Sequence, residues 1–371
     1  MKSICTKTLN LAWAICFLLF AGCTGQKDTP SEDPVDALKL KDYEPISVFN
    51  LEEHHPTAAK FSTIDMHSHA YRTDEAGIRE WAKILDENNI EKVIVHTQAF
   101  GEEFDRLYDL FTGISDKFEL WCNLDMTKWD QPEFPECAVK ELERCFAKGA
   151  RGVGELIDKG MGERVSSSGR EMGLHFNDPK FDALFEKCGE LGMPVSIHSG
   201  DPIWMYGPMD EHNDGYMNAK EWMIDLSTPG ILDLDGVVKA FEECVARHPN
   251  TQFIACHLIN INHDYPRLGE ILDRHPNLWI DISARHQETC VTPRATKSFY
   301  EKYQDRILFG TDNDPSPDMY HSQWRILETE DEHFYLKEQS YHWPMQGIGL
   351  SDEVLRKIYH DNASRLLSSR K

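Results

Sequence analysis

Eight short runs of apolar and β-branched residues recur along this chain, and longer stretches with polar and apolar residues at three- and four-residue spacing separate them. Such runs predict strands, and such spacing predicts helices. Parallel strands joined by crossover helices produce this alternation, and eight of them predict a (β/α)8 TIM barrel. The predicted strands are residues 63–67, 92–97, 118–124, 152–156, 194–198, 251–256, 278–283 and 307–310. The clearest predicted helices are residues 77–88, 135–148, 179–191, 237–248 and 265–275.

The barrel is predicted to occupy residues 43–371 as a single domain. This length, roughly 330 residues, suits one large α/β barrel, and no Pro/Gly/Ser-rich linker or internal repeat interrupts it. A doubly wound open sheet is the alternative. It gives no reason for metal-type residues to follow so many of the strands, whereas a barrel does.

Residues 1–22 resemble a bacterial lipoprotein signal peptide. Lys2 and Lys7 give a positive start, residues 11–20 form an apolar core, and two small residues precede Cys23. We therefore expect lipidation of Cys23, a flexible tether over residues 23–42, and a place in the bacterial cell envelope, either periplasmic or at the cell surface. An ordinary secretory signal cut nearby is the alternative, and the apolar core is short for a transmembrane helix.

The formal net charge of −24 argues against binding to nucleic acid, because phosphate recognition needs a basic face. The expected partners are a small-molecule substrate and, through the lipid, the membrane; whether the chain forms a homo-oligomer stays open. Beyond Cys23 the cysteines are odd in number and have no close pair, which favours buried free thiols over a disulfide framework. They are Cys122, Cys137, Cys145, Cys188, Cys244, Cys256 and Cys290.

Residues that bind metals stand at the ends of five predicted strands. His67-Ser68-His69 closes the first, and two histidines one residue apart point the same way from an extended strand. Taken singly, such a histidine is more often a satisfied core residue, and an Asp after a strand is more often a helix cap. In a barrel, however, all these side chains point into one bowl at the carboxyl ends of the strands. The set is His67, His69, Glu155, His198, His257 and Asp312.

The chain resembles the amidohydrolase superfamily, and within it the amidohydrolase-related group that also contains aminocarboxymuconate-semialdehyde decarboxylase. The resemblance spans about residues 61–367 and is carried by Ile64-Asp65-Met66-His67-Ser68-His69, Pro194-Val195-Ser196-Ile197-His198-Ser199-Gly200, Phe253-Ile254-Ala255-Cys256-His257, Leu308-Phe309-Gly310-Thr311-Asp312 and a closing helix over residues 355–363. It implies that His67, His69, His198 and Asp312 bind a metal ion, and that His257 either ligates or acts on the substrate.

The donor chemistry agrees with that assignment. Three imidazoles and a carboxylate form a borderline-soft set suited to Zn²⁺, which lowers the pKa of water toward about 7 and so supplies a nucleophile. Asp312 is expected to accept the proton of that water and pass it to the leaving group, unless it is a ligand alone. His257 is expected to polarise the substrate carbonyl or hold an oxyanion, unless it only orients another ligand.

The role of Glu155 determines whether the predicted site holds one metal ion or two. A carboxylated lysine or a glutamate at the end of strand four bridges two metals in binuclear relatives, so Glu155 with His198 and His257 could complete a second position. The most similar group is usually mononuclear, and a glutamate there can instead hydrogen-bond a ligand histidine. The sequence therefore favours one ion and leaves two open.

Two long connections, after the fifth and the fourth predicted strands, are expected to form the pocket walls. Residues 201–227 carry Trp204, Tyr206, His212, Tyr216 and Trp222, which predicts a lid. Residues 157–178 carry Lys159, Arg164 and Arg170, which could meet an anionic group of the substrate. Surface decoration is the alternative for both. Further candidate substrate contacts are Arg285, His286 and His321.

Three functions fit these features. The first is hydrolysis of an amide, lactone or ester-like bond of a small molecule, and the second is a metal-dependent decarboxylation or related lyase reaction. The third is a binding lipoprotein that has lost catalysis, which the complete ligand series disfavours. The sequence favours the hydrolase, and a carboxylate-binding arginine beside the metal would favour the lyase.

Overall fold

The computed structural model describes residues 34–165, 170–171, 173–336 and 341–368, and it divides into two compact units, Met1–Tyr43 and Glu44–Lys371. In the first unit the described residues form two short helices, α1 (Pro34–Ala37) and η1 (Leu40–Asp42). The predicted signal peptide and Cys23 lie outside the described residues. Among those described, no helix combines the length and the apolar character needed to cross a membrane.

The second unit is a (β/α)8 barrel, as the alternating pattern predicts. Its eight parallel strands form two runs, β1-β2-β3 and β10-β9-β8-β7-β4. A bridge between Cys122 and Val153 joins the two runs on one side, and the amide of Met66 donates to the carbonyl of Phe309 (2.9 Å) on the other. The strands are β1 (Thr63–His69), β2 (Ile90–His96), β3 (Phe118–Trp121), β4 (Val153–Asp158), β7 (Val195–Ser199), β8 (Phe253–Ala255), β9 (Leu278–Asp281) and β10 (Ile307–Leu308).

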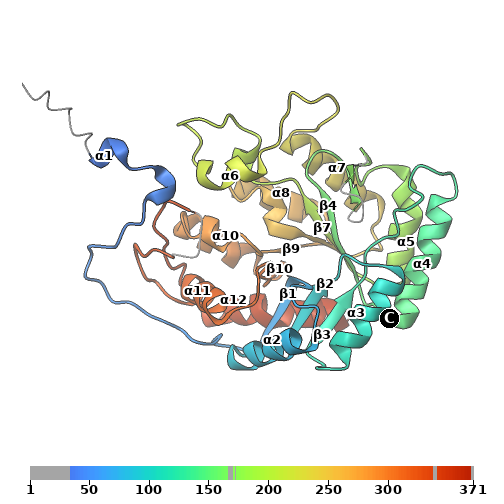
Figure 1. Cartoon of the computed structure of the whole chain (residues 1–371), viewed down its shortest axis with the longest axis horizontal. Coiled ribbons are helices and arrows are strands. Elements are labelled where there is room, and N and C mark those ends of the chain that lie inside the picture. The colour runs from blue at the N-terminus through green and yellow to red at the C-terminus, as the bar shows by residue number, and fades with distance from the viewer. Residues whose placement is uncertain (1–33, 166–169, 172, 337–340, 369–371) are drawn as a thin grey trace, which may run out of the picture. The chain divides into compact units, whose positions relative to one another are not determined.

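Helices connect the strands and surround them (Figure 1). Aspartate or serine caps several of them, as Asp74 does by accepting a hydrogen bond from the amide of Gly77. The helices are α2 (Glu75–Glu87), α3 (Gly101–Thr112), α4 (Phe134–Lys148), η2 (Pro179–Phe181), α5 (Asp182–Leu191), η3 (Ile203–Met205), α6 (Tyr216–Trp222), α7 (Leu234–Arg247), η4 (Cys256–Asn260), α8 (Tyr265–Arg274), α9 (His286–Thr289), α10 (Pro293–Tyr303), α11 (Pro317–Glu328), α12 (Asp352–Arg356), η5 (Lys357–Asp361) and α13 (Asn362–Ser368).

Two apolar clusters hold the strands in place. The larger lies between strands and helices, and the smaller combines strand residues such as Ile94, Trp121 and Ile254 with Leu366 of α13. Side chains alternate along a strand, so Ile94 and His96 of β2 share one face. The face of β2 that carries Ile94 in the apolar cluster therefore carries His96 at the carboxyl end of the barrel.

Small elements decorate the carboxyl ends of the strands. A two-stranded antiparallel hairpin, β5 (Arg164–Val165) with β6 (Arg170–Glu171), follows β4, and η3 and α6 lie in the long connection after β7. The predicted lid segment is thus partly helical.

Candidate metal centre

Glu155 of β4 occupies the middle of a ring of four histidines. Its Oε1 lies 3.1 Å from His198 Nδ1, 3.1 Å from His257 Nε2 and 3.5 Å from His67 Nε2. Its Oε2 lies 3.5 Å from His69 Nε2. These residues come from β4, β7, the turn after β8, and β1, so the parallel strands deliver them to one place, as a barrel requires.

Asp312 completes the ring from the segment after β10. Its Oδ1 lies 3.1 Å from His69 Nε2 and 3.8 Å from His67 Nε2, and its Oδ2 lies 3.7 Å from His257 Nε2. The amide of Asp312 donates to the carbonyl of His67 at 2.8 Å, which ties the segment to β1. A Cβ on Gly310 would approach the Cβ of His67 to 2.8 Å, so only glycine allows the two strands this close. All six predicted metal-site residues therefore lie together.

The cluster fits a divalent cation on two grounds. His67 Nε2 is a fully buried atom with no hydrogen-bond partner among the described residues. Burial lowers the pKa of His67, but the carboxylates of Asp281, Asp312 and Glu155 outweigh it and raise that pKa to about 9. Two buried carboxylates and the partly exposed Asp312 thus face the imidazoles and make a strongly negative environment, and imidazole with carboxylate is a donor set that binds Zn²⁺ and similar ions.

Asp281 and Ser283 at the end of β9 orient two of the histidines. Asp281 Oδ2 lies 2.9 Å from His67 Nδ1, and the hydroxyl of Ser283 donates to Asp281 Oδ1 at 2.5 Å. Because that hydroxyl has one proton, Ser283 Oγ can only accept from His67 Nδ1 (3.0 Å) and His257 Nδ1 (2.9 Å). The carbonyl of Ser283 also accepts from His257 Nδ1 at 2.9 Å. Both rings therefore carry a proton on Nδ1 and present Nε2 to the centre.

His198 faces the centre with its other nitrogen. Its Nε2 pairs with Asp201 Oδ1 at 3.0 Å, which leaves Nδ1 beside Glu155. The second oxygen of Asp201 lies 3.0 Å from Lys159 Nζ. Burial raises the pKa of Asp201, but His198 and Lys159 outweigh it and lower the pKa to about 2. Asp201 is thus a charged acceptor that fixes the ring of His198.

Two residues flank His69. Its Nδ1 donates to the carbonyl of His96 at 3.2 Å, so Nε2 faces Glu155 and Asp312. The hydroxyl of Tyr71 donates to Asp312 Oδ1 at 3.1 Å. His96 itself is buried, and neither of its ring nitrogens has a partner among the described residues. Burial holds the pKa of His96 well below its usual value, so this ring stays neutral.

Groups of potential ligand atoms within 4.8 Å of one another occur twice in the described part of the chain. One group is His67, Glu155, Cys256 and His257, and the other is His67, His69 and His96. Burial raises the pKa of the Cys256 thiol well above its usual value, and its Sγ lies 3.1 Å from Ser196 Oγ. The imidazoles and carboxylates are therefore the stronger candidates.

Left-handed backbone presents several of these side chains. Four consecutive non-glycine residues, His257 to Asn260, have φ between 56° and 59°, and Ala284 and Asp312 have φ of 51° and 49°. Such conformations are costly for residues with a Cβ and concentrate at functional sites. Here they lie at the carboxyl ends of β8, β9 and β10, where the six residues meet.

A cavity of about 360 Å³ opens above the centre. Its lining includes His198, His257 and Asp312, so a bound molecule would touch the ring directly. Two connections meet near its mouth, because Asn218 Nδ2 donates to the hydroxyl of Tyr341 at 2.9 Å and the rings of Trp204 and Trp343 lie 6.3 Å apart. Asn218 and Trp204 belong to the segment predicted as a lid.

The candidate substrate contacts separate into two groups. Arg285 lines the cavity, as do Lys159 and Trp222. The other four do not line the cavity. Trp204 packs against Trp343, and Tyr206 donates to the carbonyl of Lys159 at 3.0 Å. His286 is buried beside Phe309, and His321 is partly exposed on α11. The side chains of Arg164 and Arg170 are outside the described part of the structure.

The sequence patterns did not single out Asp281, Ser283, Asp201 or Tyr71. The sequence does contain a sign of Asp281, because this residue ends a buried apolar strand. Asp312 was predicted from the same kind of position, just after an apolar run. Asp201 and Tyr71 stand three and two residues after candidate ligands. Spacing along one strand cannot show that Asp281 reaches His67, because their contact joins β9 to β1.

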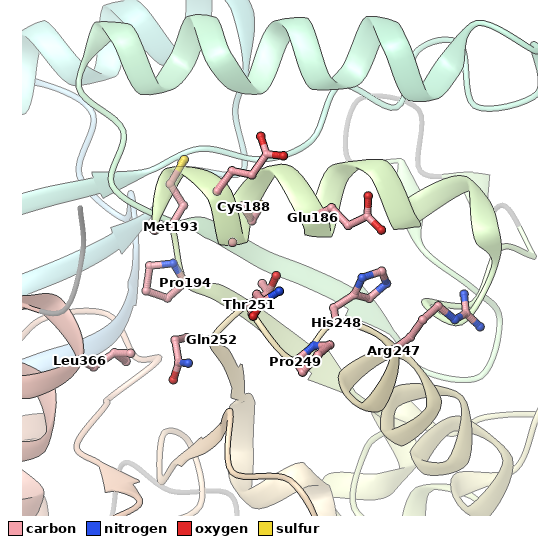
Figure 2. Close-up of a pocket in the computed structure, with 14 residues that line it drawn as sticks. Glu186, Cys188, Met193, Pro194, Arg247, His248, Pro249, Thr251, Gln252 and Leu366 are labelled. Atoms are coloured by element: carbon pink, nitrogen blue, oxygen red, sulfur yellow. The ribbon is translucent and has the colours of Figure 1, made fainter.

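A second cavity, of about 620 Å³, lies at the opposite end of β7 and β8 (Figure 2). It lies beside Pro194, which precedes β7, and Thr251 and Gln252, which precede β8. Cys188 and Glu186 of α5 and His248 after α7 form further parts of the wall. None of the six clustered residues lines this cavity.

Fold and site together define a (β/α)8 enzyme with its donor set at the carboxyl ends of the strands. A family model described as amidohydrolase matches residues 127–368, well over half of the chain. The chain therefore belongs to the amidohydrolase superfamily, whose members use a divalent metal. No curated protein matches it significantly.

Solved structures share the fold at low sequence identity. A candidate amidohydrolase from Staphylococcus aureus aligns with a TM-score of 0.52 at 16% identity, covering 82% of this chain and 99% of that one. A TIM-barrel protein from Bordetella bronchiseptica gives 0.49 at 14% identity, covering 82% and 98%. The 5-carboxyvanillate decarboxylase of Sphingomonas paucimobilis gives 0.49 at 12% identity, covering 83% and 99%.

Proposed function

We propose that this protein is a metal-dependent hydrolase that cleaves an amide, lactone or ester-like bond of a small molecule. The observation that carries the proposal is the position of Glu155, whose two oxygens lie within 3.5 Å of four imidazole nitrogens beneath a cavity. A divalent ion, for which Zn²⁺ is the best match to the donors, supplies the Lewis-acid chemistry that makes water a nucleophile near neutral pH.

The donors around Glu155 would hold two ions, one on each side of its carboxylate. His67, His69 and Asp312 surround one side of its carboxylate, and His198 and His257 surround the other. The sequence favours a single ion because a glutamate can instead hydrogen-bond one ligand histidine. Glu155, however, contacts histidines on both sides at similar distances, which supports two.

Asp312 is the residue that we assign to proton transfer. It is one-fifth exposed in its side chain and lines the cavity, so it can reach both the nucleophilic water and a leaving group. Burial raises the pKa of Asp312, but His67 and His69 outweigh it and hold that pKa well below its usual value. A carboxylate that is ionised before the reaction can accept the proton of water and deliver it to the leaving group.

His257 is better suited to ligate than to donate. The carbonyl of Ser283 holds the proton of its ring on Nδ1, and burial lowers the pKa of the ring. A neutral imidazole with its proton on Nδ1 has only a lone pair on Nε2, the atom that faces Glu155. His257 therefore cannot donate a hydrogen bond to a substrate oxygen from that atom.

Turnover by the metal-loaded protein tests the proposal. Metal-free protein would be loaded with Zn²⁺ or Mn²⁺ and offered esters, lactones, N-acyl compounds and carboxylated aromatics, with a chelated sample and Asp312→Asn as controls. We expect release of a hydrolytic acid that both controls abolish. Turnover that survives chelation, or that Asp312→Asn leaves unimpaired, would contradict the mechanism.

Decarboxylation is the second candidate, and one observation favours it. Arg285 is a cavity-lining cation close to the donor ring, where it could hold a carboxylate group. The same screen separates the two reactions, because release of carbon dioxide without a hydrolytic acid would identify the lyase.

We also propose that a lipid on Cys23 anchors the protein in the bacterial cell envelope, with residues 24–42 as a tether. The support is the positive start, short apolar core and small residues before Cys23. Fractionation of cells that express the full chain is the test. Wild-type protein should sediment with membranes, and Cys23→Ser should not; equal membrane association of both would refute the anchor.

A further inference from the structure

We propose that Arg285 binds a carboxylate of the substrate, so that the substrate of this site is a small organic acid. This inference rests on the proposed function and narrows it to a chemical class: in the hydrolase the carboxylate held by Arg285 orients the substrate, whereas in the decarboxylase candidate it would be the group that is lost. Arg285 follows β9 and is only 7% exposed, yet it lines the same cavity as His198, His257 and Asp312. Among the described lining residues of that cavity, Lys159 is the one other Lys or Arg.

The guanidinium of Arg285 is held in a fixed orientation. Its Nε and Nη2 both donate to Asn260 Oδ1, at 2.9 and 2.5 Å, and its Nη1 donates to the carbonyl of Ala284 at 2.7 Å. Asn260 cannot turn over, because its Nδ2 donates to the carbonyls of Ser199 and Gly200. The cation is thus positioned before any ligand arrives.

Two N–H groups of this guanidinium remain for a ligand. The three bonds above use one hydrogen on each nitrogen, and the second hydrogens of Nη1 and Nη2 have no acceptor among the described residues. A planar anion with two oxygens matches a pair of such donors, and carboxylate is the common organic anion of that shape.

Arg285 has an ion pair with the carboxylate of Glu288, but no anion among the described residues accepts a hydrogen bond from its guanidinium. Its three hydrogen bonds go to two acceptors, the amide oxygen of Asn260 and the carbonyl oxygen of Ala284, and both are neutral. The carboxylate of Glu288 lies 3.6 Å from Nε, where no hydrogen bond forms, and receives bonds from Tyr341 Oη and Asn262 Nδ2 instead. A buried cation that lacks a directly bonded anion is stabilised by an anionic ligand.

The backbone links this cation to the reacting centre. Asn260 and Ala284, which hold Arg285, both have the left-handed conformation, with φ of 56° and 51°. Asn260 ends the same left-handed turn that begins with His257. A carboxylate on Arg285 would therefore sit at a fixed offset from the metal centre, as substrate orientation requires.

Lys159 is less suited to the role. Its Nζ lies 3.0 Å from Asp201 Oδ2 and 5.1 Å from the ring of Trp222. This ammonium is thus already paired with an anion beside His198, and we assign recognition of the substrate to Arg285.

Matched acid and amide substrates test the inference. The metal-loaded enzyme would be assayed on a panel of N-acetyl amino acids and on the corresponding N-acetyl amino amides, which differ only in the negative charge. We expect kcat/KM to favour the acids by roughly 10- to 100-fold, the range for a hydrogen bond to a charged group. Arg285→Gln should remove that preference, mainly by raising KM for the acids.

Arg325→Gln is the matched control. Arg325 of α11 is about as buried as Arg285, but its Nε donates to Asp331, and it lines no part of the cavity. This variant should keep the acid preference. If Arg285→Gln does not fold, Arg285→Lys replaces it as the test variant, because lysine keeps the positive charge but lacks the paired N–H donors. The preference for acids over amides should then be smaller than in the wild type but not lost. Equal turnover of acids and amides by the wild type, or an unchanged ratio in the Arg285 variant, would overturn the inference and leave the hydrolase intact.

If no member of the panel turns over, that result counts against the proposed hydrolase function and not against the role of Arg285. A binding assay then tests Arg285 without turnover. Benzoate and benzamide would be titrated calorimetrically into the metal-loaded protein. Benzoate should bind, benzamide should bind at least roughly 10-fold more weakly, and Arg285→Gln should lose the difference. Benzoate affinity that Arg285→Gln does not change would overturn the inference.

Discussion

The two ends of the barrel carry cavities of very different character. The cavity at the amino ends of β7 and β8 has about 620 Å³, and the one at their carboxyl ends has about 360 Å³. The larger contains Arg247 and His248, which both pair with Asp182, and Thr251, whose hydroxyl donates to the carbonyl of Phe185 at 2.6 Å. Apart from His248 Nδ1, which has no partner among the described residues, these groups join α5 to α7 and to the segment before β8.

The smaller cavity differs in where its polar groups point. Four imidazoles and two carboxylates from five strand ends converge there, and neighbours such as Asp281 and Asp201 set the direction of individual rings. We therefore place the proposed chemistry where oriented donors converge, and not in the larger cavity. Changes at the carboxyl end should alter turnover, and changes at the amino end should alter stability.

Glu155→Gln should have the largest effect. Glutamine has the shape of glutamate but lacks its charge, so it cannot serve as a shared anionic ligand. Turnover should fall on the order of 10³-fold, because metal activation supplies several kcal/mol of transition-state stabilisation. Steady-state assays of wild type and variant at equal protein concentration measure this. Turnover within a factor of two of wild type would remove the distinction between the two ends.

Phe185→Ala should act at the amino end on stability. Phe185 is fully buried on α5, with its ring 5.8 Å from that of Phe181 and 5.6 Å from that of Phe253. Its loss should cost about 3–5 kcal/mol of unfolding free energy, because it removes buried area and leaves a void. Urea denaturation gives the cost, and turnover per folded molecule should not change. A large loss of turnover in folded protein would be the contrary result.

Asp281→Asn should weaken metal binding at the carboxyl end of the barrel. The change keeps the side chain's shape. Because the backbone amides of His257 and Ser283 donate to Asp281 Oδ1, the oxygen of the asparagine stays there and its NH2 group faces His67 Nδ1, so the ring is no longer held with Nε2 toward the centre. Metal affinity should fall about 10- to 100-fold. Competition with a chromophoric chelator measures it, with Ser283→Ala as the milder comparison. If both variants bind metal as tightly as wild type, these residues do not orient the ligands.

Arg247→Ala should have the smallest effect. Its side chain is 37% exposed and pairs with Asp182 at 2.7 Å, an arrangement that contributes at most about 1 kcal/mol. Thermal unfolding should shift slightly, and turnover should stay the same. A clear change in turnover would show that the large cavity takes part in function.

The sequence predicted the barrel, and it predicted that the six candidate ligands lie together, because both depend on local patterns. Apolar runs located all eight strands, although β3, β8, β9 and β10 are shorter than expected. Their place at the end of a strand put His198 and Asp312 in the bowl. Parallel strands in a closed barrel end at one rim, so order along the chain converts directly into proximity.

Contacts between strands could not be predicted in the same way. Two hydrogen bonds join residues that no spacing rule connects: His67 Nδ1 to Asp281, and Arg285 Nε to Asn260. His286 illustrates the converse, because it follows a strand as Arg285 does but is buried beside Phe309, away from the cavity. Which of two adjacent side chains faces the bowl depends on the left-handed turn at Ala284, and the sequence has no glycine there to signal it.

Metal analysis of the purified protein tests the central claim most directly. Wild-type protein and Glu155→Gln would be dialysed against metal-free buffer, incubated with Zn²⁺, desalted and measured by inductively coupled plasma mass spectrometry. A centre built around Glu155 predicts close to two zinc ions per wild-type chain and at most one in the variant. A wild-type chain that retains no zinc would contradict the metal centre, and equal zinc in both proteins would contradict the role of Glu155.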